Sequence, residues 1–249
     1  MAITNKGTIF TNFDTTSNSS TLSFGNTSRT IQVGELVIVA TASKRTSSGV
    51  LALMNSITLG STGATFTFVQ NTTWTGSSST STAYAGLSVG YWLADQVVAS
   101  GTSVSASAST TGQSIAAIGF SVSGADLSRA PVSAIKTAAA SQTPQLAVTP
   151  GLANCGGIAF LNYRQDFGTG EVFPTNCINT PLTLTDDFGF INRQTTTGAE
   201  KQLEIMGGNN IGTATSKTLG ASSATTRTVG VTVITFAPVV ESEPAINLL

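Results

Sequence analysis

The serine with the most suggestive surroundings is Ser88, because residues 86–90 (GLSVG) match the G-x-S-x-G pattern of serine hydrolases. That pattern functions on a strained strand-to-helix turn, with a histidine that accepts the serine proton. The chain contains no histidine, and the segment lies inside an alternating apolar pattern that is typical of a strand. We therefore expect no hydrolase activity, and we expect Ser88 to be an outward-facing polar residue between Leu87 and Val89.

Two further short motifs lack the partners that their chemistry requires. Residues 133–136 (SAIK) match the S-x-x-K motif of penicillin-binding proteins, but the S-D-N and K-T-G elements are missing. Residues 166–168 and 187–189 both read D-F-G, without the glycine-rich loop or the H-R-D element of a kinase. Asp followed closely by Gly is ordinary turn chemistry, so these triplets predict turns.

Acidic residues remain the other candidates for catalysis, since a glycosidase needs only two carboxylates. The candidates are Asp166, Glu171, Asp186 and Asp187. Adjacent Asp186 and Asp187 would point to opposite faces of an extended chain, and the spacing of a calcium-binding loop is absent. Cys155 and Cys177 do not form a Cys-x-x-Cys motif, and we expect two inert thiols. We predict neither a metal nor a cofactor, and no enzyme.

Charge is scarce and balanced, with 11 basic and 12 acidic residues. Without a cluster of Lys and Arg, the sequence predicts no binding to nucleic acid or to anionic membranes. The first residues lack the basic and apolar regions of a signal peptide, so we expect synthesis in a cytoplasm. Trp74, Tyr84, Tyr91 and Trp92 lie close in the sequence and could contact sugar rings or a partner protein if they are exposed.

Short apolar or alternating segments, separated by Gly, Ser and Asn, predict a series of strands. We expect an all-β chain folded as an antiparallel, jelly-roll-like β-sandwich with extended terminal arms. Its expected parts are an N-terminal arm or edge strands (1–30), a sandwich (31–238) with a long loop at about 164–200, and a C-terminal tail (239–249). Residues 134–140 fit a helical turn or a strand equally well, and no internal repeat is evident. The expected strands are 35–41, 50–59, 65–74, 87–93, 103–109, 114–122, 157–163 and 228–236.

The succession of these segments is similar to β-sandwich domains of bacteriophage structural proteins and of some bacterial surface proteins. The similarity is carried by residues 34–40, Trp74, residues 86–94, residues 99–104, residues 116–126 with Pro131, and residues 229–238. It covers about residues 30–238, and the segment 164–200 departs from it. The resemblance implies a sandwich used for assembly or adhesion, and it implies no functional residue.

On this basis the sequence predicts a virion protein, an accessory capsid protein of the decoration or cement type, whose partners are the major capsid protein or other virion proteins. Low charge favours self-association, and the resemblance suggests a trimer. The predicted partner-binding residues are the apolar side chains of the C-terminal tail: Val239, Val240, Ile246, Leu248 and Leu249. The alternatives are a carbohydrate-binding or adhesin module and, on the acidic residues, a glycosidase.

Overall fold

The computed structural model is built from antiparallel β-strands, and the predicted all-β sandwich is confirmed. All eight predicted strands are present, and residues 134–140, which fitted either state, lie in a strand. The structure describes residues 3–14, 21–45, 53–77, 82–108, 114–126, 128–129, 131–141, 145–150, 152, 154–163, 176–180, 191–194, 201–208, 217–222 and 227–240.

The first half of the chain, residues 3–126, contributes eight strands to two sheets. The larger sheet has the order β1-β8-β3-β6-β5, and the smaller has the order β2-β7-β4. Successive strands alternate between the two sheets, except that β5 pairs with β6 in the larger one, which gives a jelly-roll arrangement. The strands are β1 (Thr4–Asp14), β2 (Thr21–Asn26), β3 (Leu36–Arg45), β4 (Met54–Leu59), β5 (Thr67–Ser77), β6 (Thr82–Leu93), β7 (Ser103–Ala108) and β8 (Ser114–Ser123).

The second half, residues 131–240, repeats this strand order. Its larger sheet runs β9-β16-β11-β14-β13 and its smaller sheet runs β10-β15-β12, which are the first-half orders with eight added to each label. The strands are β9 (Val132–Ser141), β10 (Gln145–Val148), β11 (Gly156–Tyr163), β12 (Asn176–Thr180), β13 (Ile191–Gln194), β14 (Lys201–Gly208), β15 (Lys217–Ser222) and β16 (Arg227–Phe236). The chain is therefore a tandem pair of jelly rolls.

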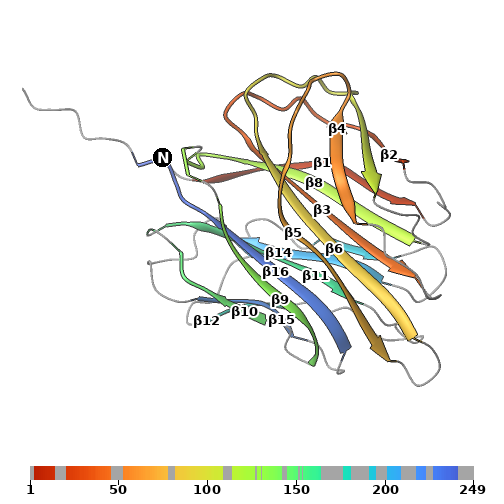
Figure 1. Cartoon of the computed structure of the whole chain (residues 1–249). Helices are drawn as coiled ribbons and strands as arrows, with labels where there is room; N and C mark the ends of the chain where they lie inside the picture. The colour runs from red at the N-terminus through yellow and green to blue at the C-terminus, as the bar shows by residue number, and fades with distance from the viewer. Residues whose placement is uncertain are drawn as a thin grey trace, which may run out of the picture.

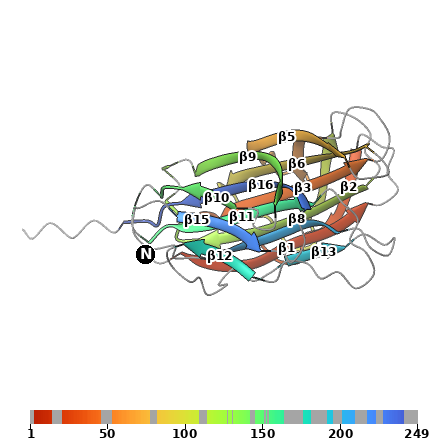
Figure 2. The ribbon, with the colours of Figure 1, turned by 90° about the horizontal axis from the view of Figure 1, so that it is seen from below.

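The two jelly rolls pack through their larger sheets, so that the molecule has four layers of strands (Figures 1 and 2). One apolar cluster joins the facing sheets, and we call it the inter-half core. Two further clusters lie between the larger and smaller sheet of each half. The inter-half core contains Ile3, Leu36, Ile38, Ala40, Ala42, Leu87, Val89, Ile118, Phe120, Val122 and Ala125 from the first half, and Ile158, Phe160, Ile234 and Phe236 from the second.

The apolar patterns of the sequence follow from these layers. Strand β3 is apolar at successive positions because it is buried on both faces: Ile38 enters the inter-half core, whereas Val37 and Val39 enter the core of the first half. Strand β2 lies in an outer layer and alternates instead, with Leu22 and Phe24 buried between exposed neighbours. The continuous apolar run of β3 therefore fits an inner layer, and the alternation of β2 fits an outer one.

Equivalent elements meet each other in pairs across the two halves. Strand β3 contacts β14, and its counterpart β11 contacts β6, which is the counterpart of β14. Beyond β8 and β16 the chain forms an antiparallel bridge between Ala125 and Pro238. The Asp126 N–H donates to Ala237 O, and the Val239 N–H donates to Gly124 O, each over 2.8 Å. Antiparallel pairing of equivalent segments is what a two-fold arrangement produces.

The division predicted from the sequence does not follow this repeat. Of the two alternatives predicted for the first 30 residues, the structure shows edge strands and not an arm: β1 and β2 lie at sheet edges, and Ile9 and Phe10 are buried. The segment 164–200, predicted as a loop, contains β12 and β13. Both strands are short and carry few apolar residues, and pairing with β15 and β14 defines them. The sandwich continues to the bridge at Pro238, and Val239 is hydrogen-bonded to it.

Candidate functional site

Ser88 is not outward-facing, as the sequence suggested, but only 3% exposed. Strand β6 lies between β3 and β5 in the larger sheet of the first half, so Leu87 and Val89 enter the inter-half core while Ser88 faces the core of the first half. The Met54 N–H donates to Ser88 Oγ over 3.2 Å, which joins β4 of the smaller sheet to β6. Its surroundings therefore give Ser88 a structural role in holding the two sheets together.

A polar cluster that the sequence analysis missed lies where β3 begins. The Arg29 guanidinium donates to Glu35 Oε2 over 2.8 Å, and the Ser121 hydroxyl, which also accepts from Arg29, donates to the same carboxylate. Burial raises the pKa of Glu35, but the hydrogen bonds from Arg29 and Ser121 and the charge of Arg29 outweigh it, so this pKa lies below its ordinary value. Ser121 is fully buried and Glu35 nearly so, and the cluster fixes the β2–β3 connection.

The remaining catalytic candidates give no site within the described part of the chain. Asp166, Glu171, Asp186 and Asp187 lie outside the described residues, as do the side chains of Ser133, Lys136 and Cys177. Cys155 is free and buried; burial raises the pKa of its thiol, which donates to Leu152 O over 3.0 Å. No group of His, Cys, Asp and Glu suited to a metal ion occurs among the described residues.

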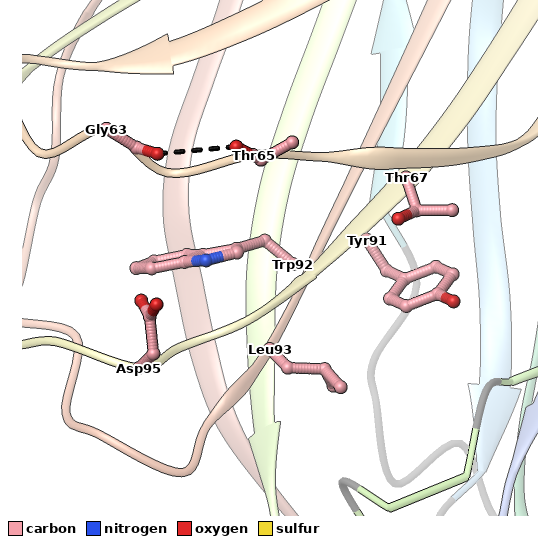
Figure 3. A pocket seen from close by; sticks show the side chains of 7 residues that line it. All are labelled: Gly63, Thr65, Thr67, Tyr91, Trp92, Leu93 and Asp95. Carbon is pink, nitrogen blue, oxygen red and sulfur yellow. Dashed lines mark hydrogen bonds between the residues drawn. The ribbon is translucent and has the colours of Figure 1, made fainter.

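Of the four aromatic residues singled out from the sequence, Tyr91 and Trp92 line a cavity of about 330 Å³ at the edge of a larger sheet. The side chains of Trp74 and Tyr84 lie outside the described residues. Figure 3 shows the Asp95 carboxylate pointing toward the indole of Trp92, with Gly63 and Thr65 above it. We call this cavity the β5–β6 notch, because it opens where β5 begins beside the end of β6.

The predicted partner-binding residues divide at the bridge that ends the sandwich. Val239 is partly buried and is hydrogen-bonded to the chain's own Gly124, whereas Val240 is 70% exposed. Ile246, Leu248 and Leu249 lie outside the described residues. Two more exposed valines, Val33 and Val97, occupy the paired segments 31–34 and 94–98.

These features share one end of the sandwich. Strand β3 begins there and β6 and β8 end there, since Leu36 pairs with both Leu93 and Val122. The start of β1 lies at the same end, because Thr4 pairs with Ser123 (Figure 1). We call it the exit end, because the described part of the chain ends there at Val240. Its three exposed valines are the large apolar side chains that the described surface presents to solvent.

Comparison with known proteins identifies no relative: no family model, curated protein or solved structure matches the chain. Among the described residues, no helix is long and apolar enough to cross a membrane. The evidence for function therefore comes from the fold and from the exit end.

Proposed function

We propose that the chain is a structural component of a virus particle, an accessory capsid protein of the decoration or cement type in a bacteriophage. Jelly rolls form capsid domains and lectin domains, so the tandem fold is compatible with this role without assigning it. The observation that carries the proposal is the exit end, where the described part of a weakly charged chain ends in exposed Val240 and the sequence continues with Ile246, Leu248 and Leu249.

The tail supplies the proposed contact. Val239 anchors the last described residues to Gly124, so the segment that follows starts from a fixed point. Val240, Ile246, Leu248 and Leu249 are apolar, and burying each such side chain contributes about 1.5–3 kcal/mol before ordering costs. We infer that these four residues bind a neighbouring subunit or the major capsid protein. An apolar contact of this kind resists moderate salt, unlike an interface built on ion pairs.

The proposal has a direct test in cells that carry the gene. Particles are purified on a density gradient, and an antibody against the chain is applied to them as immunogold in electron microscopy. We expect gold on the capsid at a regular copy number. The proposal fails if the chain stays in the soluble fraction while particles band without it.

Self-association belongs to the same proposal. Weakly charged faces leave little repulsion between copies, and closed symmetry is usual for such assemblies. We propose a homo-oligomer, with a trimer as the specific expectation. Sedimentation velocity at micromolar concentration gives the test: a monomer would contradict self-association without the particle.

A further inference from the structure

The β5–β6 notch exists because two neighbouring strands are offset. Strand β5 begins at Thr67, opposite Tyr91, whereas β6 continues to Leu93 with no β5 residue paired to it. Residues 63–66 instead turn away, and Phe66 packs inside the first half against Trp92, with ring centroids 6.2 Å apart. The result is an open cavity of about 330 Å³, near the lower limit of the sizes of ligand pockets.

Main-chain polar groups point into this notch. The Ala94 N–H donates to Glu35 O on the β3 side, and in a strand the main-chain groups of successive residues point to alternate sides. The N–H and C=O of Leu93 therefore point to the other side, where β5 has not begun. The notch thus offers one donor and one acceptor from the end of β6, whose other side is paired with β3.

The opposite wall is also held in place. The Gln96 side chain donates to Thr62 O, and the Thr62 hydroxyl donates to Leu59 O over 2.7 Å. The Thr65 hydroxyl contacts Gly63 O at 3.4 Å, as Figure 3 shows. A cavity with fixed walls binds a ligand with little loss of conformational entropy.

Three of the side chains around the notch carry hydrogen-bonding groups that the protein itself does not use. Among the described residues, neither Thr67, Tyr91 nor Asp95 has a side-chain hydrogen-bond partner, and Thr67 and Asp95 are exposed. Tyr91 is partly exposed and lies beside Thr67 in Figure 3. No basic residue lines the cavity, and Asp95 carries a negative charge, so the notch disfavours anions.

We propose that the β5–β6 notch binds a neutral saccharide of one or two rings. A sugar presents adjacent hydroxyl donors, which suit the Asp95 carboxylate and Leu93 C=O, and acceptor oxygens, which suit Leu93 N–H, Thr67 and Tyr91. Its apolar ring face fits the partly exposed ring of Tyr91. The proposal does not depend on the assembly role, because the notch and the tail are separate features of the exit end.

The test uses the full chain and ligand-observed NMR with neutral hexoses, N-acetylhexosamines and their dimers, together with a uronic acid. We expect saturation transfer to at least one neutral sugar. Asp95→Asn should weaken it about tenfold, equivalent to about 1.4 kcal/mol, and Tyr91→Phe by a smaller factor. The control variant is Val97→Ser, which changes an exposed side chain outside the notch and should bind as the parent does.

Three outcomes overturn the proposal: no transfer to any neutral sugar at millimolar concentration, unchanged binding by Asp95→Asn with an unchanged melting temperature, or stronger binding of the uronic acid. Particle binding by the Asp95→Asn variant separates this proposal from the assembly role. We expect that variant to bind particles normally while its sugar binding is weakened.

Discussion

The two halves of the molecule have the same strand order but fill equivalent positions with different side chains. Leu36 pairs with Val122 in the first half, and Gly156 pairs with Phe236 at the equivalent position of the second. A Cβ atom on Gly156 would lie 2.2 Å from the Phe236 ring, so the large ring requires the small partner. Each pair fills its share of the inter-half core, with the volume divided differently between the strands.

The comparison extends to the polar groups. Glu35 precedes β3 and forms the cluster with Arg29 and Ser121, whereas its counterpart Cys155 precedes β11 as a buried thiol. Ala42 of β3 corresponds to Asn162 of β11, whose side chain donates to Gly86 O in the other half over 2.7 Å. Equivalent positions therefore carry different chemistry: an ion pair at Glu35 against a buried thiol at Cys155, and a hydrogen-bonding amide at Asn162 against the apolar Ala42.

The largest expected effect is at Phe160, whose equivalent in the first half is Ala40. Phe160 is fully buried, and its ring lies 6.3 Å from that of Phe120 across the two halves. We expect Phe160→Ala to lower the free energy of unfolding by about 3–5 kcal/mol. Urea denaturation measures this, and a loss below about 1 kcal/mol would show that the two larger sheets are not packed against each other.

The Gly156–Phe236 pair gives a sharper test of how side-chain volume is divided between the paired strands. Gly156→Ala should cost about 1–3 kcal/mol by forcing the Phe236 ring to move. In the double variant with Phe236→Val, the added methyl group has space, so the two changes should couple favourably by roughly 1–2 kcal/mol. A double-mutant cycle in urea measures the coupling energy, and simple additivity would contradict the proposed division of volume.

A smaller effect is expected for the Asn162 side chain, which is hydrogen-bonded to the other half. Asn162→Ala removes the donor to Gly86 O and should cost about 0.5–1.5 kcal/mol. Val240→Ala, at an exposed position, is the matched control and should change stability by no more than about 0.5 kcal/mol. Equal effects of the two variants would mean that the bond contributes nothing measurable.

The smallest effects concern the dependence of folding stability on pH. The first half should lose stability at acid pH and the second half at alkaline pH. The lowered pKa of Glu35 gives stability that is present above its unfolded-state pKa of about 4.3 and is lost as pH falls through the folded value. The raised pKa of Cys155 gives stability that is present below its unfolded-state pKa of about 8.5 and is lost as pH rises toward the folded value.

Between about pH 6 and 8 stability should be nearly flat, since no histidine is present. Melting temperatures across pH 3–10 test this. Glu35→Gln should reduce the loss of stability on the acid side alone, and Cys155→Ala should reduce the loss on the alkaline side alone. If either variant changes stability on both the acid and the alkaline side, the assignment of acid sensitivity to the first half and alkaline sensitivity to the second is wrong.

How much the sequence predicts depends on whether a feature is local. Strands such as β3 and β8 were predicted because their apolar patterns are contained in a few consecutive residues. The repeat was missed because equivalent positions carry side chains of different size. The pair Leu36 and Val122 of the first half corresponds to the pair Gly156 and Phe236 of the second, so the two sequences do not look alike.

The candidate sites show the same limit. Tyr91 and Trp92 were singled out from the sequence, but the notch they line depends on where β5 begins relative to β6, which pairing decides. The cluster of Glu35 with Ser121 joins residues 86 positions apart, and no motif marks that distance. Val240 was predicted as apolar and available, whereas the hydrogen bond that anchors Val239 required the second half to be in place.

The central claim is that the tandem sandwich binds its particle through the apolar residues of the C-terminal tail. Its most direct test is removal of residues 241–249. This cut leaves the Val239–Gly124 hydrogen bond intact. The measurement compares the melting temperature with co-sedimentation on particles lacking the chain. We expect an unchanged melting temperature and lost binding; undiminished binding by the shortened chain would contradict the claim.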